Sequence, residues 1–172
     1  MGIEGEGTGD ARNGFPLCES AEPGRNLMRA LVQRVREAAV TVNGKETGRI
    51  GTGMLVLMGV RKGDTPGMAK ALAARVAGLR IFRDEADKMN RSLADVGGAV
   101  LAVSQMTLYG DTSKGRRPSF DEVARGEEAQ PLYDLFVETL RGLGVRVETG
   151  IFGAMMDVHL VNDGPVTFLL EL

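Results

Sequence analysis

An amide and two hydroxyl side chains lie close together in Ser104-Gln105-Met106-Thr107, directly after the apolar run 99–103. Such an apolar run is typical of a strand that is buried on both faces. Polar groups at the end of a buried strand must find hydrogen-bond partners or contact a ligand, and the strand holds them rigidly. By itself the segment also fits a strand end tied into a turn. It is the first candidate for a site of chemistry.

The composition disfavours several kinds of catalytic centre. His159 is the single histidine and Cys18 the single cysteine, so a zinc site or a Cys–His pair lacks side chains. No nucleophile elbow, Walker loop or dinucleotide fingerprint occurs. We therefore predict an activity without metal or cofactor. The remaining candidates are backbone amides and the uncharged polar side chains of Ser104, Gln105, Thr107 and Thr167. Such groups can orient a substrate and stabilise an oxyanion, but they include no evident base.

A second unusual feature is the step Gly164-Pro165. Proline is disfavoured inside a sheet ladder, so we expect it at a strand start or in a tight turn. The glycine before it allows its backbone to approach another surface closely. We predict that 162–165 is a turn joining strands over 156–161 and 166–170.

A third feature is the basic cluster Lys114, Arg116 and Arg117, which follows the polar strand end in sequence. These side chains fit a solvated loop without further explanation. Next to a substrate site they would equally serve to bind the phosphates of a nucleic acid.

Length and composition set the wider frame. The 172 residues predict one domain, with 43% hydrophobic and 26% charged residues, as is ordinary for a soluble globular protein. No apolar run approaches the roughly 18–20 residues that span a bilayer. A single cysteine cannot form an intramolecular disulfide, and a reducing cytoplasm fits this best.

Residues 1–27 differ from the rest of the chain, because they combine six glycines with five acidic and two basic residues and show little apolar periodicity. We interpret them as a flexible extension. The remaining 28–172 carries 19 basic and 18 acidic residues, instead of 21 and 23 for the whole chain. This near-neutral balance does not indicate a surface that coats nucleic acid, although it allows a local phosphate contact.

The apolar pattern predicts an α+β fold. Helices are expected from Thr65-Pro66, where a capping hydroxyl precedes proline, and from Pro131. Asn43-Gly44 indicates a hairpin. Further strands are expected over 28–36, 39–42, 45–50, 54–60, 99–103 and 145–148. We predict a largely antiparallel sheet with two main helices on one face, in α/β/β layers, so that a second sheet layer or a partner subunit must cover the other face.

Taken together, two motifs resemble the D-aminoacyl-tRNA deacylase family: Ser104-Gln105-Met106-Thr107-Leu108 and Asn162-Asp163-Gly164-Pro165-Val166-Thr167. The resemblance extends to Gln33-Arg34-Val35, Lys88-Met89-Asn90 and Arg117-Pro118-Ser119-Phe120, in order, and spans essentially all of 28–172. Met106 departs from the family, which usually has phenylalanine there. Methionine is apolar and adaptable, so a pocket lining can survive with an altered shape.

The resemblance implies an esterase that removes D-amino acids, and also glycine, from the 3′-terminal ribose of tRNA while rejecting L-aminoacyl-tRNA. It implies a homodimer with active sites at the subunit interface, where Gly164-Pro165, with its bond cis, enters the partner's pocket and sterically excludes L-side chains. Arg34 would help to fix that turn. Ser104, Gln105, Met106 and Thr107 would form the pocket floor, and Asn162 and Thr167 would contact the substrate.

Two mechanisms and two other functions stay open at this point. In the family, the ribose 2′-hydroxyl is thought to assist hydrolysis while backbone donors stabilise the oxyanion; an older proposal makes the residue matching Thr107 a nucleophile. We favour substrate assistance, because no residue that commonly activates threonine is apparent nearby. The chain would alternatively be a non-catalytic tRNA- or protein-binding dimer, or a hydrolase of small D-amino-acid esters or amides.

Overall fold

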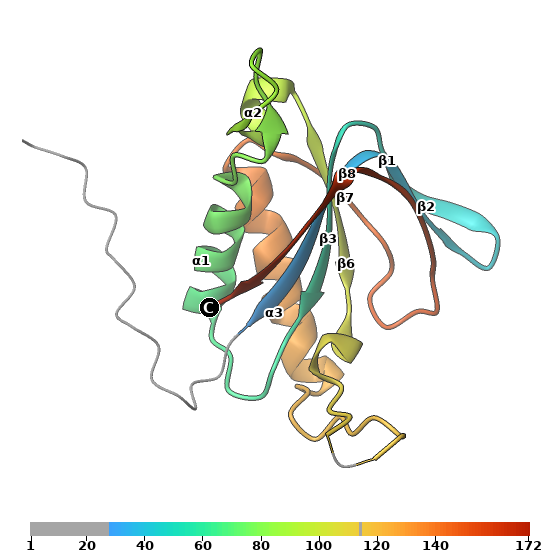
Figure 1. Ribbon diagram of the computed structural model, residues 1–172. Helices are drawn as coiled ribbons and strands as arrows, with labels where there is room; N and C mark the ends of the chain where they lie inside the picture. Colours follow the sequence, from blue (N-terminus) through green and yellow to red (C-terminus); the bar gives the residue numbers. More distant parts are fainter. Residues whose placement is uncertain (1–27, 114) are drawn as a thin grey trace, which may run out of the picture.

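The computed structural model describes residues 28–113 and 115–172, and its central element is the long strand β1 (Arg29–Val42) (Figure 1). The predicted extension 1–27 and Lys114 lie outside the described residues. Two separate strands were expected over 28–42, but β1 is continuous, because it pairs along its length with the C-terminal strand β8 (Asp157–Glu171). The hairpin at Asn43-Gly44 is confirmed: both residues have positive φ, 50° and 76°, and lead into β2 (Lys45–Ile50).

Strand order in the main sheet is β2-β1-β3-β6-β7, with β8 also paired to β1. β1 is antiparallel to β2, to β3 (Gly53–Gly59) and to β8, as predicted. The prediction of a largely antiparallel sheet is wrong for the other half: β3, β6 (Ala99–Ser104) and β7 (Arg146–Thr149) run parallel. Parallel neighbours need long crossover connections, and the two main helices lie in those connections.

Helix α1 (Pro66–Ala77) begins as predicted, with the Thr65 side chain accepting a hydrogen bond from the Met68 backbone N–H at 3.4 Å. The predicted start of the second main helix at Pro131 is wrong, since α3 (Gly126–Gly142) begins five residues earlier. Pro131 is therefore the sixth residue of α3, where it cannot donate the usual helical hydrogen bond to the Glu127 carbonyl, and the helix continues through it.

Several small elements complete the described fold. β4 (Phe82–Arg83) and β5 (Met89–Arg91) form a two-stranded sheet. α2 (Leu93–Val96) is a single helical turn, which the sequence pattern did not predict; it begins at a capping box formed by Ser92 and Asp95. In the part of the chain that the structure describes, no helix is long and apolar enough to cross a membrane.

Helices α1 and α3 cover one face of the sheet, as predicted (Figure 1). On the other face, Val40 and Ile50 from the outer half of the β1–β2 hairpin pack with Leu55 and Leu101 from the centre of the sheet. β2 contacts β6 and β7 although neither is its hydrogen-bonded neighbour. The expected second β layer is thus supplied by one sheet that curls over itself.

The predicted turn between two separate C-terminal strands is wrong. Residues 162–165 do not turn the chain back, because both flanking segments belong to the single strand β8 and pair with β1 in the same direction. Pro165 is accommodated inside this strand because β8 is at an edge of the described sheet, where a missing donor breaks no ladder on the open side.

The close approach of β3 and β6 depends on Gly53. A Cβ at this position would lie 1.9 Å from the Ala99 carbonyl oxygen, which is backbone and cannot rotate away. We expect Gly53→Ala to lower the free energy of unfolding by about 3 kcal/mol or more, measured by urea denaturation. The matched control is Gly51→Ala, where nothing lies within 4 Å of the new Cβ. A loss for Gly53→Ala as small as that of the control would contradict this packing.

Candidate active site

The first group of candidate residues begins where β6 ends. Ser104 is the last residue of β6 and pairs with Met58 of β3. The Gln105 backbone N–H continues this contact by donating to the Met58 carbonyl at 2.7 Å. Residues 99–103 of the strand are buried, whereas Ser104 and Gln105 are partly exposed. The predicted change from a buried strand to an accessible polar end is confirmed.

A single turn of 3-10 helix, Met106–Tyr109, follows the strand and presents Met106 and Thr107 to solvent. The Gln105 side-chain amide donates a hydrogen bond to the Thr107 hydroxyl oxygen. An amide N–H is a donor and cannot remove the proton of the hydroxyl. The contact therefore orients Thr107 without activating it as a nucleophile.

Arg29, the first residue of β1, contacts the turn Met106–Tyr109 and holds it against the sheet. Its guanidinium lies 4.8 Å from the centre of the Tyr109 ring, and it donates a hydrogen bond of 2.9 Å to the Leu108 carbonyl. Glu171 of β8 accepts from its Nε at 2.7 Å. Burial raises the pKa of Tyr109 well above its ordinary value.

The second group lies in β8, where the strand bulges away from β1. Gln33 pairs with Thr167 and Val35 pairs with Asn162, so the four residues 163–166 of β8 face Arg34 alone. Gly164-Pro165 lies in this bulge, with both residues exposed and the peptide bond between them cis. Gly164 has φ +146°, and a Cβ there would lie 2.6 Å from Cγ2 of Val166. Only glycine fits this position.

Asn162 closes the bulge from within β8. Its side-chain oxygen accepts a hydrogen bond from the Val166 backbone N–H at 2.8 Å, while its amide nitrogen donates to the Thr167 hydroxyl at 3.1 Å. The Gln33 side chain on β1 donates to the same hydroxyl at 3.3 Å. Asn162 and Thr167 therefore hold the ends of the bulge together and to β1.

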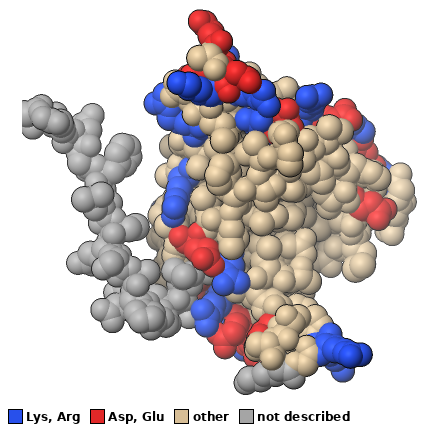
Figure 2. All heavy atoms as spheres, viewed as in Figure 1, with Lys and Arg blue, Asp and Glu red and all other residues tan. Residues whose placement is uncertain are grey.

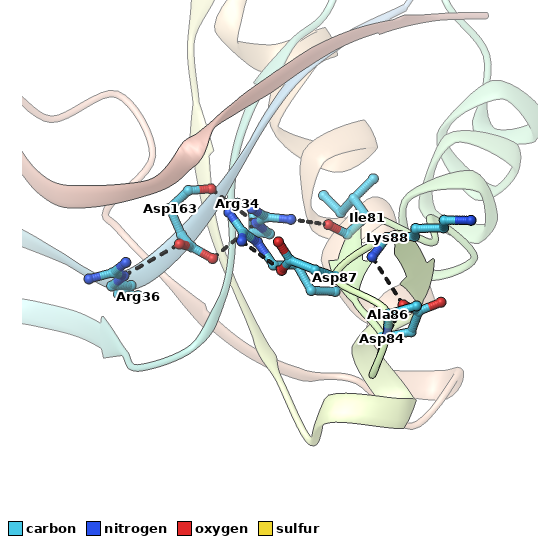
Figure 3. A network of polar contacts seen from close by, with 9 residues as sticks. Arg34, Arg36, Ile81, Asp84, Ala86, Asp87, Lys88 and Asp163 are labelled. Carbon is cyan, nitrogen blue, oxygen red and sulfur yellow. Dashed lines mark hydrogen bonds and ion pairs between the residues drawn. The ribbon is translucent and has the colours of Figure 1, made fainter.

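Arg34 of β1 holds the bulge in place. Figure 3 shows its guanidinium between Asp163, which is in the bulge, and Ile81, which follows α1 in the chain. Its side chain is only 2% exposed. It donates hydrogen bonds to the carbonyls of Asp163, at 3.0 Å, and Ile81, at 2.5 Å, and it forms an ion pair of 3.1 Å with the Asp163 carboxylate. The Asp163 carboxylate also pairs with the exposed Arg36 at 3.4 Å.

Sequence reasoning missed Asp163, Arg36 and Ile81 as partners in this network. The sequence did contain a signal for the ion pair of Asp163. Asp163 is acidic and adjoins Gly164-Pro165, and Arg34 was expected to hold the same segment. The contact of Arg36 and the carbonyl of Ile81 depend on tertiary packing and leave no such signal.

Comparison with known proteins decides the family. A family model described as D-Tyr-tRNA(Tyr) deacylase matches residues 31–171. A D-aminoacyl-tRNA deacylase from Thermomicrobium roseum is 65% identical over 144 residues, covering 84% of this chain and 94% of its own. The chain belongs to the D-Tyr-tRNA(Tyr) deacylase family. The resemblance inferred from the sequence motifs is thereby confirmed, and with it the prediction of a hydrolase family.

A further relative and two solved structures are also similar to this chain. A D-aminoacyl-tRNA deacylase from Symbiobacterium thermophilum is 59% identical over 145 residues, 84% of this chain and 96% of its own. The solved structure of a c-Myc DNA unwinding element binding protein has a TM-score of 0.78 at 40% identity, covering 84% of this chain and 98% of that one. A eukaryotic protein described as a probable D-amino acid tRNA deacylase shares the fold, with a TM-score of 0.75 at 20% identity, covering 85% of this chain and all of that one.

Within one chain, this deacylase fold keeps the two groups of candidate residues apart. Ser104 pairs with Met58 of β3, and Met58 pairs with Ala30 of β1, so Ser104 lies at the height of Ala30 in the sheet. The bulge faces Arg34, which is four residues further along β1. At roughly 3.3 Å per residue and roughly 4.8 Å per strand, the groups are separated by about 13 Å along the strands and about 14 Å across them. Each group is internally assembled, but the two do not meet.

The remaining candidates lie outside both groups. Arg116 and Arg117 are exposed in a loop whose ends are joined by two backbone hydrogen bonds of 2.8 Å between Asp111 and Ser119. Lys114 falls outside the described residues. His159 is exposed on β8 opposite Ala39, about 30 Å along β1 from the level of Ser104. Among the described residues, no three His, Cys, Asp or Glu side chains cluster closely enough to hold a metal ion.

We expect Arg29→Ala to loosen the turn Met106–Tyr109, because it removes the contact with the Tyr109 ring and the hydrogen bond to Leu108. The free energy of unfolding should fall by about 1–2 kcal/mol. Amide hydrogen exchange at Leu108 and Gly110 should become faster. Arg75→Ala is the control, since Arg75 donates to the Glu171 carbonyl at 3.2 Å. Unchanged exchange at Leu108 and Gly110 in the Arg29 variant would contradict this role.

Proposed function

We propose that this protein hydrolyses the ester bond of D-aminoacyl-tRNA, releasing the free D-amino acid and tRNA, and thereby removes mischarged tRNA before translation. The proposal is supported by family membership over residues 31–171 and by relatives named D-aminoacyl-tRNA deacylase that it covers almost completely. Glycyl-tRNA is also a substrate and L-aminoacyl-tRNA is rejected. A cytoplasmic location agrees with a substrate that is made and used there.

The structural observation that supports a shared active site is the separation, within one chain, of the group that begins at Ser104 from the bulge that contains Gly164-Pro165. A homodimer solves this problem, because Gly164-Pro165 of one subunit can enter the neighbourhood of Ser104 of the other. The exposed apolar side chains on β8 support such an interface: Val161 is 44%, Phe168 38% and Leu169 51% exposed. Figure 2 shows a broad area of the molecule without Lys, Arg, Asp or Glu between charged ends, as suits contact with a second subunit.

In this dimer Gly164-Pro165 acts as a chiral filter. The bulge is exposed at Gly164-Pro165 and held at both ends by Asn162 and Thr167, so its backbone can occupy the space that an L-side chain would need. A rigid obstacle discriminates by repelling the wrong substrate instead of binding the right one more tightly. Glycine has no side chain to exclude, which explains why a filter of this kind accepts glycyl-tRNA.

The pocket floor is formed by Ser104, Gln105, Met106 and Thr107. Gln105 and Thr107 position the ester, Met106 lines the pocket with an adaptable apolar side chain, and backbone N–H groups stabilise the oxyanion. The ribose 2′-hydroxyl of the terminal nucleotide assists the attacking water. This division of roles is supported by the hydrogen bond from Gln105 to Thr107, which orients the hydroxyl without offering it a base.

Binding of the tRNA body is assigned to the basic loop. Arg116 and Arg117 are exposed and follow the pocket floor in sequence, and Lys114 belongs to the same stretch. Such side chains contact phosphates without reading sequence.

The second candidate function is nucleic-acid binding without hydrolysis. It is favoured by one observation: a solved relative at 40% identity is named a c-Myc DNA unwinding element binding protein. Tight retention of charged tRNA with its ester intact would support this function. Turnover of small D-amino-acid esters without any need for tRNA would instead indicate a general esterase.

The proposed function predicts fast ester loss from D-tyrosyl-tRNA and glycyl-tRNA, with L-tyrosyl-tRNA stable over the same time. The measurement is the survival of the labelled ester on matched tRNA molecules. Equal loss of the D- and L-esters would leave a deacylase but remove the filter from Gly164-Pro165. No loss from any of the three would reject the deacylase function.

Substrate assistance predicts different outcomes for two changes. Replacing the terminal adenosine by 2′-deoxyadenosine should slow hydrolysis by about 10²–10⁴-fold, because it removes a group that assists proton transfer. Thr107→Ala should lower kcat by only about tenfold, since Thr107 positions the ester. Loss of a covalent nucleophile instead costs on the order of a millionfold. Such a loss in Thr107→Ala, with binding retained, would favour the nucleophile mechanism; single-turnover rates distinguish the two.

A further inference from the structure

Among the residues that the structure describes, Arg34 is the only charged residue whose side chain is buried, and the carboxylate that pairs with it belongs to Asp163. A buried cation is destabilising unless it is paired and hydrogen-bonded. Asp163 meets this need twice, with its carboxylate at 3.1 Å and its backbone carbonyl at 3.0 Å from the same guanidinium nitrogen. The residue next to Gly164-Pro165 is thus tied to β1 through both its side chain and its main chain.

Two further contacts hold Asp163 and Arg34 in their places. The second oxygen of Asp163 faces Arg36, which is 75% exposed and follows Arg34 by two residues on β1. The far side of the Arg34 guanidinium donates to Ile81, so Arg34 cannot follow the bulge if the bulge moves. Figure 3 shows Asp163 between the two arginines, with Arg34 continuing toward Ile81.

We propose that the charge of Asp163 is the positioning element that sets the chiral filter, because it fixes Gly164-Pro165 relative to β1 at a site where Arg34 cannot yield. This inference rests on the proposed function and deepens it: Asp163 acts through the turn and does not contact the substrate. A steric filter depends on position within a fraction of an ångström, and a displacement of about 1 Å in a reactive site commonly changes rates a hundredfold. Loosening the turn should therefore admit L-substrates.

The test is Asp163→Asn, which keeps the backbone carbonyl and the side-chain shape but removes the negative charge. We expect the ratio of D-tyrosyl-tRNA to L-tyrosyl-tRNA hydrolysis, compared as kcat/KM, to fall at least tenfold, chiefly because the L-ester is lost faster. A residue with a purely structural role would lower both rates together and leave this ratio unchanged. Thermal unfolding of the variant, measured in parallel, accounts for any loss of folded protein.

The matched control is Asp87→Asn. Asp87 lines the same hollow of about 410 Å³ as Arg34, Gly164 and Pro165, but it pairs with Arg83 at 2.7 Å. Asp87→Asn makes the same chemical change near Gly164-Pro165 without removing the partner of Arg34. It should leave the ratio of D-tyrosyl-tRNA to L-tyrosyl-tRNA hydrolysis as in the wild type. If the control moved the ratio as far as Asp163→Asn does, a general change of local charge would explain the effect and the proposal would be overturned.

A second variant keeps the proposal testable if Asp163→Asn does not fold. Arg34→Lys keeps a buried cation near Asp163, but a single ammonium lacks the planar fork that reaches Asp163 and Ile81 together. We expect the same fall in the D-to-L ratio. A folded Arg34→Lys or Asp163→Asn protein with the wild-type ratio would overturn the role of Asp163 while leaving the deacylase function intact. A wild-type protein that hydrolyses neither ester would reject the function itself.

Discussion

The structure depends most on the strand β1, because its backbone pairs with three other strands while two of its side chains hold the two groups of candidate residues. Arg29 at its start holds the turn after β6, and Arg34 in its middle holds the bulge in β8. The positions of both groups therefore depend on the one continuous backbone of β1. A shift of one residue in the β1–β3 register would turn every β1 side chain to the opposite face and release both groups at once.

The two arginines act in different physical settings. Arg29 is about one-third exposed, so water competes for its contacts and each contributes modestly to stability. Arg34 is almost completely buried, so water competes little for its guanidinium, although the Asp163 carboxylate that pairs with it is 27% exposed. A buried ion pair of this kind stabilises one arrangement more than it stabilises folding as such, because its desolvation cost offsets much of the attraction. The bulge in β8 is thus held by a buried arginine, and the turn Met106–Tyr109 by a partly exposed one.

Sequence reasoning succeeded where local signals and tertiary structure agree. The change of composition at Ser104 marked the end of β6, Asn43-Gly44 marked a hairpin, and Thr65-Pro66 marked a helix start. It failed at 162–165, where four consecutive turn-forming residues indicated a turn between two strands. The pairing of β8 with β1 on both sides of those residues overrode that preference. Local propensity contains no information about such a partner, which lies about 130 positions away in the sequence.

The same limit applies to the candidate site. The family motifs include Ser104, Gly164-Pro165 and Arg34, but they did not indicate the contacts of Arg29, Arg36 and Ile81 that hold these residues in place. Spacing along the chain also did not indicate that the two groups lie apart within one subunit. The distance follows from sheet order: β6 and β8 are on opposite sides of the β1–β3 pair. No rearrangement of side chains can bridge two intervening strands of a hydrogen-bonded sheet. The proposed active site, which uses both groups, would therefore need a second copy of the chain, and the attachment of each group to its own β1 would then fix the shape of the pocket between the two subunits.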